Sequence, residues 1–154
     1  MQKVSPNYRL VVISIASPLQ LGVYEDEQLI ESLSSDQKTS EILVSLIIEL
    51  LAKYPITQIL YTHGPGSYMA IKLTYIMLKT IEIVREIEFV GVDAFSFNDN
   101  QPIKALGSLY FVKQENEIIT QKFDTKLEQT FSLPQSITHL TLSDNKPLYI
   151  LPAV

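Results

Sequence analysis

Residues 56–84 read ITQILYTHGPGSYMAIKLTYIMLKTIEIV, and this stretch decides the fold. Ile56–Tyr61 predicts a buried strand, and Tyr68–Val84 predicts a helix without internal glycine or proline. Gly64-Pro65-Gly66-Ser67 lies between them as a strand-to-helix turn. Its glycines permit positive φ and close backbone approach, and Ser67 can cap the helix. Such junctions are where α/β proteins place chemistry or a partner.

This turn has two possible uses. It can hold a phosphate at the helix N-terminus, or it can be a tight turn only. The phosphate loop of nucleotide hydrolases ends in Gly-Lys-Ser/Thr, and the dinucleotide fingerprint has a third glycine. Here Tyr68-Met69-Ala70 follows Ser67, so both motifs are absent. The residues alone favour a structural turn.

The flanking sequence predicts an α/β fold. A three-strand meander precedes a β-α-β-α-β pattern, which is typical of a mixed sheet covered by helices. The first strand is almost continuously apolar and should be central, covered on both faces. The additional predicted elements are strands Tyr8–Ala16, Gln20–Glu25, Gln28–Leu33 and Glu88–Val92, and a helix over Thr39–Tyr54.

The remaining sequence predicts a smaller second part. Asp93 is expected to cap a short helical turn through Phe97, so residues 1–98 form the first subdomain and residues 99–154 a short, reduced second one. The second part is expected to contain a hairpin of Ala105–Lys113 and Glu117–Phe123, a helical turn near Thr125–Gln129, and short strands at His139–Leu142 and Leu148–Leu151.

Composition limits the possible functions. The 154 residues are 46% hydrophobic and 19% charged, with a net charge of −5 and no cysteine. The charge argues against an independent grip on nucleic acid, and the absence of cysteine excludes disulfides and thiolate metal sites. Met1–Asn7 is too polar for a signal peptide, and no apolar run reaches membrane-spanning length, so we expect a cytoplasmic protein.

Both long helices are more apolar than a surface helix needs. In the first, polar residues occupy one narrow stripe, and the apolar arc is about twice the ~100° typical of surface helices. Either the helices and the C-terminal part cover each other, or another protein covers them. The spacing of Gly66, Ala70 and Thr74 also permits close approach of another helix. The predicted partner-contact residues are Leu43, Leu46, Ile47, Leu50, Gly66, Met69, Ala70, Leu73, Thr74 and Met77.

Four segments resemble the bacterial TsaB (YeaZ) family over residues 8–97. Gly64–Lys72 resembles the family segment "GPGSFTGLR", and Ile15-Ala16-Ser17 stands where the family has "DTS". Thr39–Leu51 resembles "HSERLLPLIDELL", and Phe89–Val92 resembles the strand ending "PLVGVSS". Beyond Gln101, only Pro147–Ile150 resembles the family, in its closing "PVYLR".

The resemblance implies an actin-like ATPase, ribonuclease-H-like fold with a five-stranded mixed sheet and a second subdomain. It implies a non-catalytic scaffold in the tRNA threonylcarbamoyladenosine-modification complex, without a cofactor of its own. It also implies a heterodimer with the catalytic subunit TsaD through the two helices, with the ATPase TsaE possible in a larger complex. The chain alone is expected to form a homodimer, and tRNA contact is expected to be indirect.

Three departures from the family pattern bear on function. Ile15 replaces the opening-strand Asp, Thr39 replaces the His, and Met69-Ala70 replaces Thr-Gly. Loss of the Asp removes the acidic group that related ATPases use near the metal and phosphates. A nucleotide-binding or phosphotransferase member of the same fold stays the alternative, and a peptidase is the weakest.

No residue receives a catalytic or metal-binding assignment. His63 could act as a base, but no neighbouring feature orients it, and His139 lacks metal-ligand spacing to it. Asp93 is explained by capping, and Ser67 lacks the Gly-x-Ser-x-Gly elbow of a hydrolase. Lys72, Lys79 and Glu82 form a stripe that is either solvated or at an interface rim.

Overall fold

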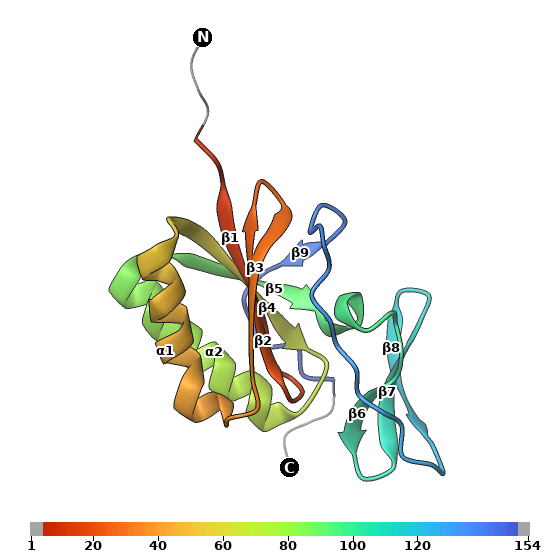
Figure 1. The fold of residues 1–154 in the computed structure, drawn as a ribbon. Coiled ribbons are helices and arrows are strands. Elements are labelled where there is room, and N and C mark those ends of the chain that lie inside the picture. Colours follow the sequence, from red (N-terminus) through yellow and green to blue (C-terminus); the bar gives the residue numbers. More distant parts are fainter. Residues whose placement is uncertain (1–4, 151–154) are drawn as a thin grey trace.

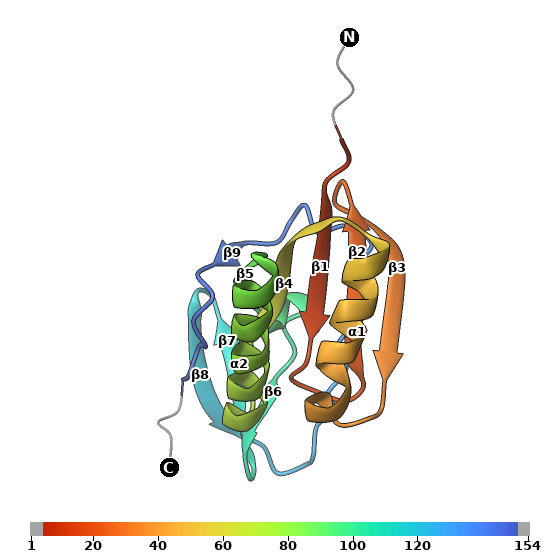
Figure 2. The ribbon, with the colours of Figure 1, turned by 90° about the vertical axis from the view of Figure 1, so that its left-hand side faces the viewer.

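The computed structural model describes residues 5–150 and has a layered α/β architecture. Two helices cover one face of the larger sheet, and a smaller sheet and the segment that directly follows it lie on the other side (Figure 1). Figure 2 shows the helices side by side along the larger sheet. Within residues 5–150, no helix is long and apolar enough to cross a membrane.

The larger sheet has six strands in the order β3-β2-β1-β4-β5-β9. Central β1 pairs antiparallel with β2 and parallel with β4, and β5 pairs parallel with β4, which confirms the mixed sheet. A sixth strand joins the expected five, because the C-terminal segment adds β9 antiparallel to β5. The strands are β1 (Tyr8–Ile13), β2 (Leu19–Glu25), β3 (Gln28–Ser35), β4 (Ile56–Gly64), β5 (Glu88–Asp93) and β9 (Leu142–Ser143).

The two long helices form where the sequence predicts them. They are α1 (Thr39–Lys53) and α2 (Tyr68–Arg85), and the short 3-10 helix η1 (Ala94–Phe97) follows β5. Pro55 follows α1 closely, as expected for a residue that cannot continue a helix. Ser67 caps α2 by accepting a hydrogen bond from Ala70 N at 3.4 Å, as predicted. Asp93 caps η1 through Phe95 N at 2.9 Å.

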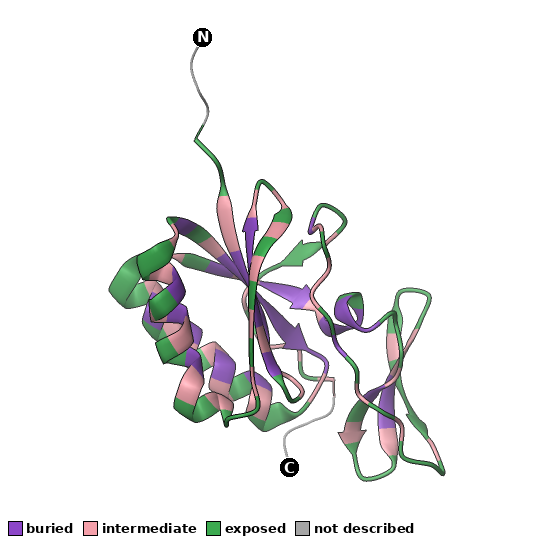
Figure 3. Cartoon of the chain, in the orientation of Figure 1, coloured by how far each residue is buried: buried purple, intermediate pink, exposed green. Residues whose placement is uncertain are grey.

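The apolar core has one part on each face of the larger sheet. Alternation along β1 sends Leu10 and Val12 toward the helices, and Val11 and Ile13 toward the opposite side. All four side chains are inaccessible to solvent, which confirms a central strand covered on both faces. Figure 3 shows buried residues concentrated in the central strands and exposed residues on the outer faces of both helices.

The second sheet differs in detail from the prediction. It contains β6 (Ile103–Leu106), β7 (Leu109–Gln114) and β8 (Glu117–Lys122), in antiparallel order. A turn at Gly107, where φ is +59°, divides what the sequence predicted as one strand. The helical turn predicted near Thr125–Gln129 is wrong, because this polar segment runs without helical hydrogen bonding along the smaller sheet.

The C-terminal segment returns to the larger sheet. Tyr24 Oη donates a hydrogen bond to Pro134 O at 2.6 Å, and Leu29 N donates to Gln135 O at 2.9 Å. The strand predicted at His139–Leu142 is reduced to β9, and Leu148–Ile150 forms none. The predicted end of that strand at Leu151 lies outside the described residues. So does Met1–Val4, part of the segment judged too polar for a signal peptide.

Candidate functional site

The glycine turn is packed against its own chain on two sides. Gly64 has φ of +136°, and a Cβ placed there would overlap the carbonyl oxygen of Leu148. A Cβ on Gly66 would lie 3.3 Å from Ile15 Cγ2. Both glycines therefore serve close packing, and Ile15 fills space beside the turn with an apolar side chain where the resembled family has a carboxylate.

A segment that we call the C-terminal strap, residues 142–149, lies along the ends of β4 and β5. Leu148 N donates a hydrogen bond to His63 O at 2.7 Å, and Tyr61 Oη donates to Asn145 O at 2.6 Å. Gly91 N donates to Asp144 O at 3.1 Å. Burial raises the pKa of the Tyr61 phenol above its ordinary value of 10.0. The strap is thus held by hydrogen bonds in both directions, because Asn145 O and Asp144 O accept from the sheet and Leu148 N donates to it.

The polar residues near the turn make structural contacts. The buried His63 places Nδ1 3.0 Å from Lys146 O, which ties the ring to the strap. Asp93 both caps η1 and forms a 2.7 Å ion pair with Lys113 on β7, a contact that the sequence did not indicate. Ser67 Oγ serves as the α2 cap. His139 is exposed and far along the chain from these groups.

The remaining charged candidates lie on α2. Lys79 pairs with Glu82 at 3.1 Å, and Lys72 Nζ lies 5.9 Å from the centre of the Tyr68 ring. No cluster of three His, Asp or Glu residues suited to a metal ion occurs among residues 5–150. The contacts that the structure shows around the turn are those of packing, helix capping and one ion pair.

Four predicted partner-contact residues lie in the core, and this corrects their expected placement. Leu43, Ile47 and Leu50 face the sheet from α1, and each is at most 1% exposed. Thr74 is fully buried, with its Oγ1 2.7 Å from Ser14 Oγ. Their spacing placed them on an apolar arc, but helix packing onto the sheet determines which part of that arc is covered.

The stripe of small residues, Gly66, Ala70 and Thr74, was expected to face another helix, but it faces the end of β1. Gly66 packs against Ile15, and Thr74 contacts Ser14, both just after β1. The stripe thus allows α2 to approach the end of β1 within the same chain. Ala70, between them, is half-buried.

The accessible apolar surface of α2 is centred on residues that the prediction partly missed. Met69, which is 68% exposed, was among the predicted contact residues. Ile76 and Ile83, which are 51% and 76% exposed, were absent from that prediction. Heptad spacing was the signal that could have found them, because alternating steps of four and three residues follow one helix face. We define the α2 outer stripe as Met69, Leu73, Ile76, Thr80 and Ile83.

The other predicted contact residues are partly accessible. Leu46, Leu73 and Met77 are half-buried at the edges of the helix layer. Val44 on α1 was not predicted and is 40% exposed. A surface that includes both helices is therefore available, with its most exposed apolar residues on α2.

Comparison with known proteins identifies the fold. No protein-family profile and no curated protein sequence match the chain. YeaZ from Pseudomonas aeruginosa matches with a TM-score of 0.55 and 11% identity, over 76% of this chain and 65% of YeaZ. The chain has a YeaZ-like fold. It spans less than two thirds of that YeaZ chain.

A second solved structure supports the same fold. It is described as an uncharacterized protein with similarity to peptidase YeaZ from Pseudomonas aeruginosa. It matches with a TM-score of 0.54 and 11% identity, over 86% of this chain and 72% of the other. The actin-like ATPase, ribonuclease-H-like architecture expected from the sequence is consistent with this YeaZ-like fold.

In this YeaZ-like fold, the outer faces of the helices point away from the sheet. The smaller sheet and the segment that directly follows it lie on the opposite side, whereas Tyr149 packs against Tyr68 at the start of α2, with ring centres 4.6 Å apart (Figures 1 and 3). Residues 5–150 thus provide no layer over the α2 outer stripe, whose central Ile76 is 51% exposed. The alternative in which the two helices cover each other and the C-terminal segment covers the rest is therefore wrong for the α2 outer stripe, although Tyr149 does cover part of the start of α2.

Proposed function

We propose that the chain is a non-catalytic scaffold subunit of the bacterial tRNA threonylcarbamoyladenosine-modification complex, and that it binds and supports the catalytic subunit TsaD. The YeaZ-like fold and the motif resemblance around Gly64–Ser67 support this proposal. TsaE joins the pair in a larger complex, in the cytoplasm. Contact with tRNA is indirect, in keeping with a net charge of −5.

The α2 outer stripe is the observation that carries the proposal. Met69, Ile76 and Ile83 are all more than half exposed and lie seven residues apart along one helix face. Fully burying an aliphatic side chain of this size contributes about 1.5–3 kcal/mol. Because the three side chains are 51–76% exposed, a partner that covers them would gain about 3–6 kcal/mol before the costs of association.

The spacing of the stripe also indicates the kind of partner surface. Alternating steps of four and three residues suit a second helix that crosses at about 20° and interdigitates with the stripe. Because α1 lies beside α2, the proposed contact is a bundle formed by these two helices and helices of TsaD.

The packed glycine turn supports a role without catalysis. Leu148 and Ile15 occupy the space against Gly64 and Gly66, and Ser67 Oγ is engaged as a cap. His63 and Asp93 are engaged in structural contacts. On this proposal the reaction belongs to TsaD, and the chain contributes a surface that holds TsaD in its active arrangement.

Size-exclusion chromatography with light scattering tests the proposal on the purified full chain mixed with its cognate TsaD. We expect a heterodimer that Ile76→Glu and Ile83→Glu each weaken at least about tenfold, because a buried carboxylate has no partner there. Leu106→Glu is the matched control, since Leu106 is 65% exposed but lies on β6. Absence of a complex with the unmodified chain would refute the scaffold role.

A cellular measurement separates binding from support of the reaction. Depletion of the chain should lower threonylcarbamoyladenosine in tRNA, and re-expression of Leu106→Glu, but not Ile76→Glu, should restore it. The nucleotide-binding alternative predicts heat when magnesium-ATP is titrated into the isolated chain. Micromolar affinity in that titration would favour the alternative over the scaffold.

A further inference from the structure

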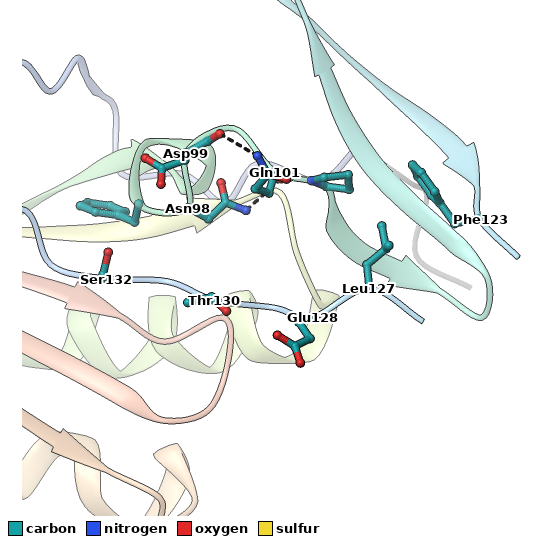
Figure 4. Close-up of a pocket in the computed structure, with 10 residues that line it drawn as sticks. Asn98, Asp99, Gln101, Phe123, Leu127, Glu128, Thr130 and Ser132 are labelled. Carbon is teal, nitrogen blue, oxygen red and sulfur yellow. Dashed lines mark hydrogen bonds between the residues drawn. The ribbon is translucent and has the colours of Figure 1, made fainter. Parts of the chain in front are cut away.

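A cleft lies between the loop that follows η1 and the segment that follows β8. Its volume is about 460 Å³, and it is lined by residues from 97–102 and 123–132 (Figure 4). It is on the side of the larger sheet opposite the helices and is separate from the α2 outer stripe. The inference about it therefore does not depend on the proposed scaffold function.

Hydrogen bonds brace the two walls of this cleft at both ends. Ser132 N donates to Phe97 O at 2.9 Å at one end. At the other end, Gln129 Nε2 donates to Pro102 O at 3.3 Å and Gln129 Oε1 accepts from Lys104 N at 2.9 Å. Thr130 lies between the braces and lines the cleft. The cleft is thus built into the fold by contacts between distant segments.

The Asn98 side chain supplies an unused acceptor in the cleft lining. Asn98 is 6% exposed, and its Nδ2 donates to Gln101 O at 2.9 Å. Its Oδ1 is buried and has no hydrogen-bond partner among the described residues. A buried carbonyl oxygen without a donor is costly, and because this one is covered, a ligand N–H reaches it only when the Asn98 side chain turns toward the cleft.

The charge of the cleft is uniformly acidic. Asp99 and Glu128 line it, and its lining, all within the described residues, contains no Lys, Arg or His. Asp99 and Asn100 both adopt left-handed backbone conformations, with φ of 55° and 57°. Gln101 Nε2 donates to Asp99 O at 3.3 Å and holds that turn. The loop therefore presents the Asp99 carboxylate from a defined backbone geometry.

Apolar side chains complete the walls beside these acceptors. Pro102, Phe123 and Leu127 line the cleft together with the polar groups. We propose that the cleft binds an ammonium or guanidinium group carried on an aliphatic stem. Such groups donate hydrogen bonds without accepting any, which matches the two carboxylates and, once its side chain turns toward the cleft, Asn98 Oδ1. The stem packs against the apolar wall, as long basic side chains do elsewhere.

The test is an NMR titration of the isotope-labelled full chain with n-butylguanidinium, and with neutral n-butylurea as the matched ligand without charge. We expect saturable shifts of the Asn98 side-chain amide and of Thr130 and Ser132. Butylurea should bind at least about fivefold more weakly, because a charged donor forms stronger hydrogen bonds.

Variants assign the binding to the cleft. Asp99→Asn and Glu128→Gln should each weaken n-butylguanidinium binding about two- to fivefold, the range expected for exposed ion pairs. Glu115→Gln removes the same charge from the exposed β7–β8 turn and should leave the affinity unchanged. Equal binding of butylurea, shifts that do not saturate, or unchanged binding by an Asp99→Asn/Glu128→Gln double variant would each overturn the proposal.

A capped Gly-Arg-Gly peptide distinguishes two sources of the same chemistry. Binding at least about tenfold tighter than n-butylguanidinium would identify a basic side chain of a protein as the occupant, since additional contacts must then form. Equal binding would identify a free small cation. Failure of both ligands to bind would overturn the site while leaving the scaffold proposal unaffected.

Discussion

Gly64 couples the end of the central sheet to the C-terminal strap. Its φ of +136° suits glycine alone, and the Leu148 carbonyl oxygen occupies the space where another residue would carry its Cβ. The sequence indicated that the turn needs glycine at position 64, but it did not indicate what excludes a larger residue there. The cause is a backbone segment that arrives from the far end of the chain.

Replacing Gly64 by alanine should therefore destabilise the fold strongly. We expect Gly64→Ala to lower the free energy of unfolding by about 2–4 kcal/mol, because backbone strain and the overlap with Leu148 act together. Gly107→Ala is the control: φ is +59° there, but no atom lies within 4 Å of the added Cβ. It should cost only about 1 kcal/mol. Urea unfolding measures both, and equal losses would contradict the overlap with Leu148.

Tyr61 should make stability depend on pH in the alkaline range. Burial raises its pKa in the folded state, so its contribution is fully present below the unfolded pKa near 10 and is lost as pH rises through the folded pKa. Tyr61→Phe should lose about 0.5–1.5 kcal/mol at neutral pH, because the hydrogen bond to Asn145 O disappears. The deficit should narrow above about pH 10, since the variant has no phenol to ionise there.

Urea unfolding at neutral and alkaline pH measures this deficit. Tyr68→Phe is the control on an exposed tyrosine, 38% accessible, and should change stability by less than about 0.5 kcal/mol at neutral pH. If the loss of unfolding free energy in Tyr61→Phe stays constant from neutral to alkaline pH, burial does not raise the pKa of the Tyr61 phenol as inferred.

At the scale of elements, α2 has two apolar faces with different neighbours. Ile71, Leu78 and Ile81 are buried against the sheet, whereas the α2 outer stripe lies on the opposite side of the helix. The composition of α2 predicted that two sides are apolar. Only its packing on the sheet separated the residues that stabilise the fold from those available to a partner.

Without a partner, the α2 outer stripe should drive self-association. We expect light scattering of the isolated chain to show a mass that rises with concentration toward that of a dimer, because Ile76 and Ile83 are largely exposed. Ile76→Glu should keep the chain monomeric, whereas Leu106→Glu should not. A monomer at high concentration, with folding verified by circular dichroism, would refute this prediction.

At the scale of the whole molecule, the C-terminal part does not form a separate lobe throughout. Residues 103–122 form the smaller sheet, but the segment after it returns across the larger sheet and adds β9 beside β5. The division into residues 1–98 and 99–154 stays a prediction. The strap nevertheless ties residues 144–148 to β4 and β5, in the first of these two parts.

Removing the strap should loosen the larger sheet. Truncation after Thr141 deletes the acceptors for Tyr61 Oη, His63 Nδ1 and Gly91 N, and the Leu148 donor. At about 0.5–1.5 kcal/mol for each hydrogen bond, the loss should be about 2–6 kcal/mol. Amide exchange at Gly91 should accelerate. Leu142→Ala, at an exposed strap position, should change stability by less than about 0.5 kcal/mol.

The sequence by itself determined the order and type of the main elements. Apolar periodicity, Pro55 and the Gly64–Ser67 turn are local signals, so they predicted β1 to β5 and both helices closely. It also indicated an α/β fold with a surplus of apolar helix surface, which the YeaZ-like fold and the exposed α2 outer stripe bear out.

Only the tertiary structure decided which face of each element is covered. Leu43 and Thr74 are buried and Ile76 is exposed because of how the helices lie on the sheet. The packing of Leu148 onto Gly64 and the cleft around Asn98 likewise join segments distant in sequence. Such contacts depend on the path of the whole chain, and a local pattern does not encode them.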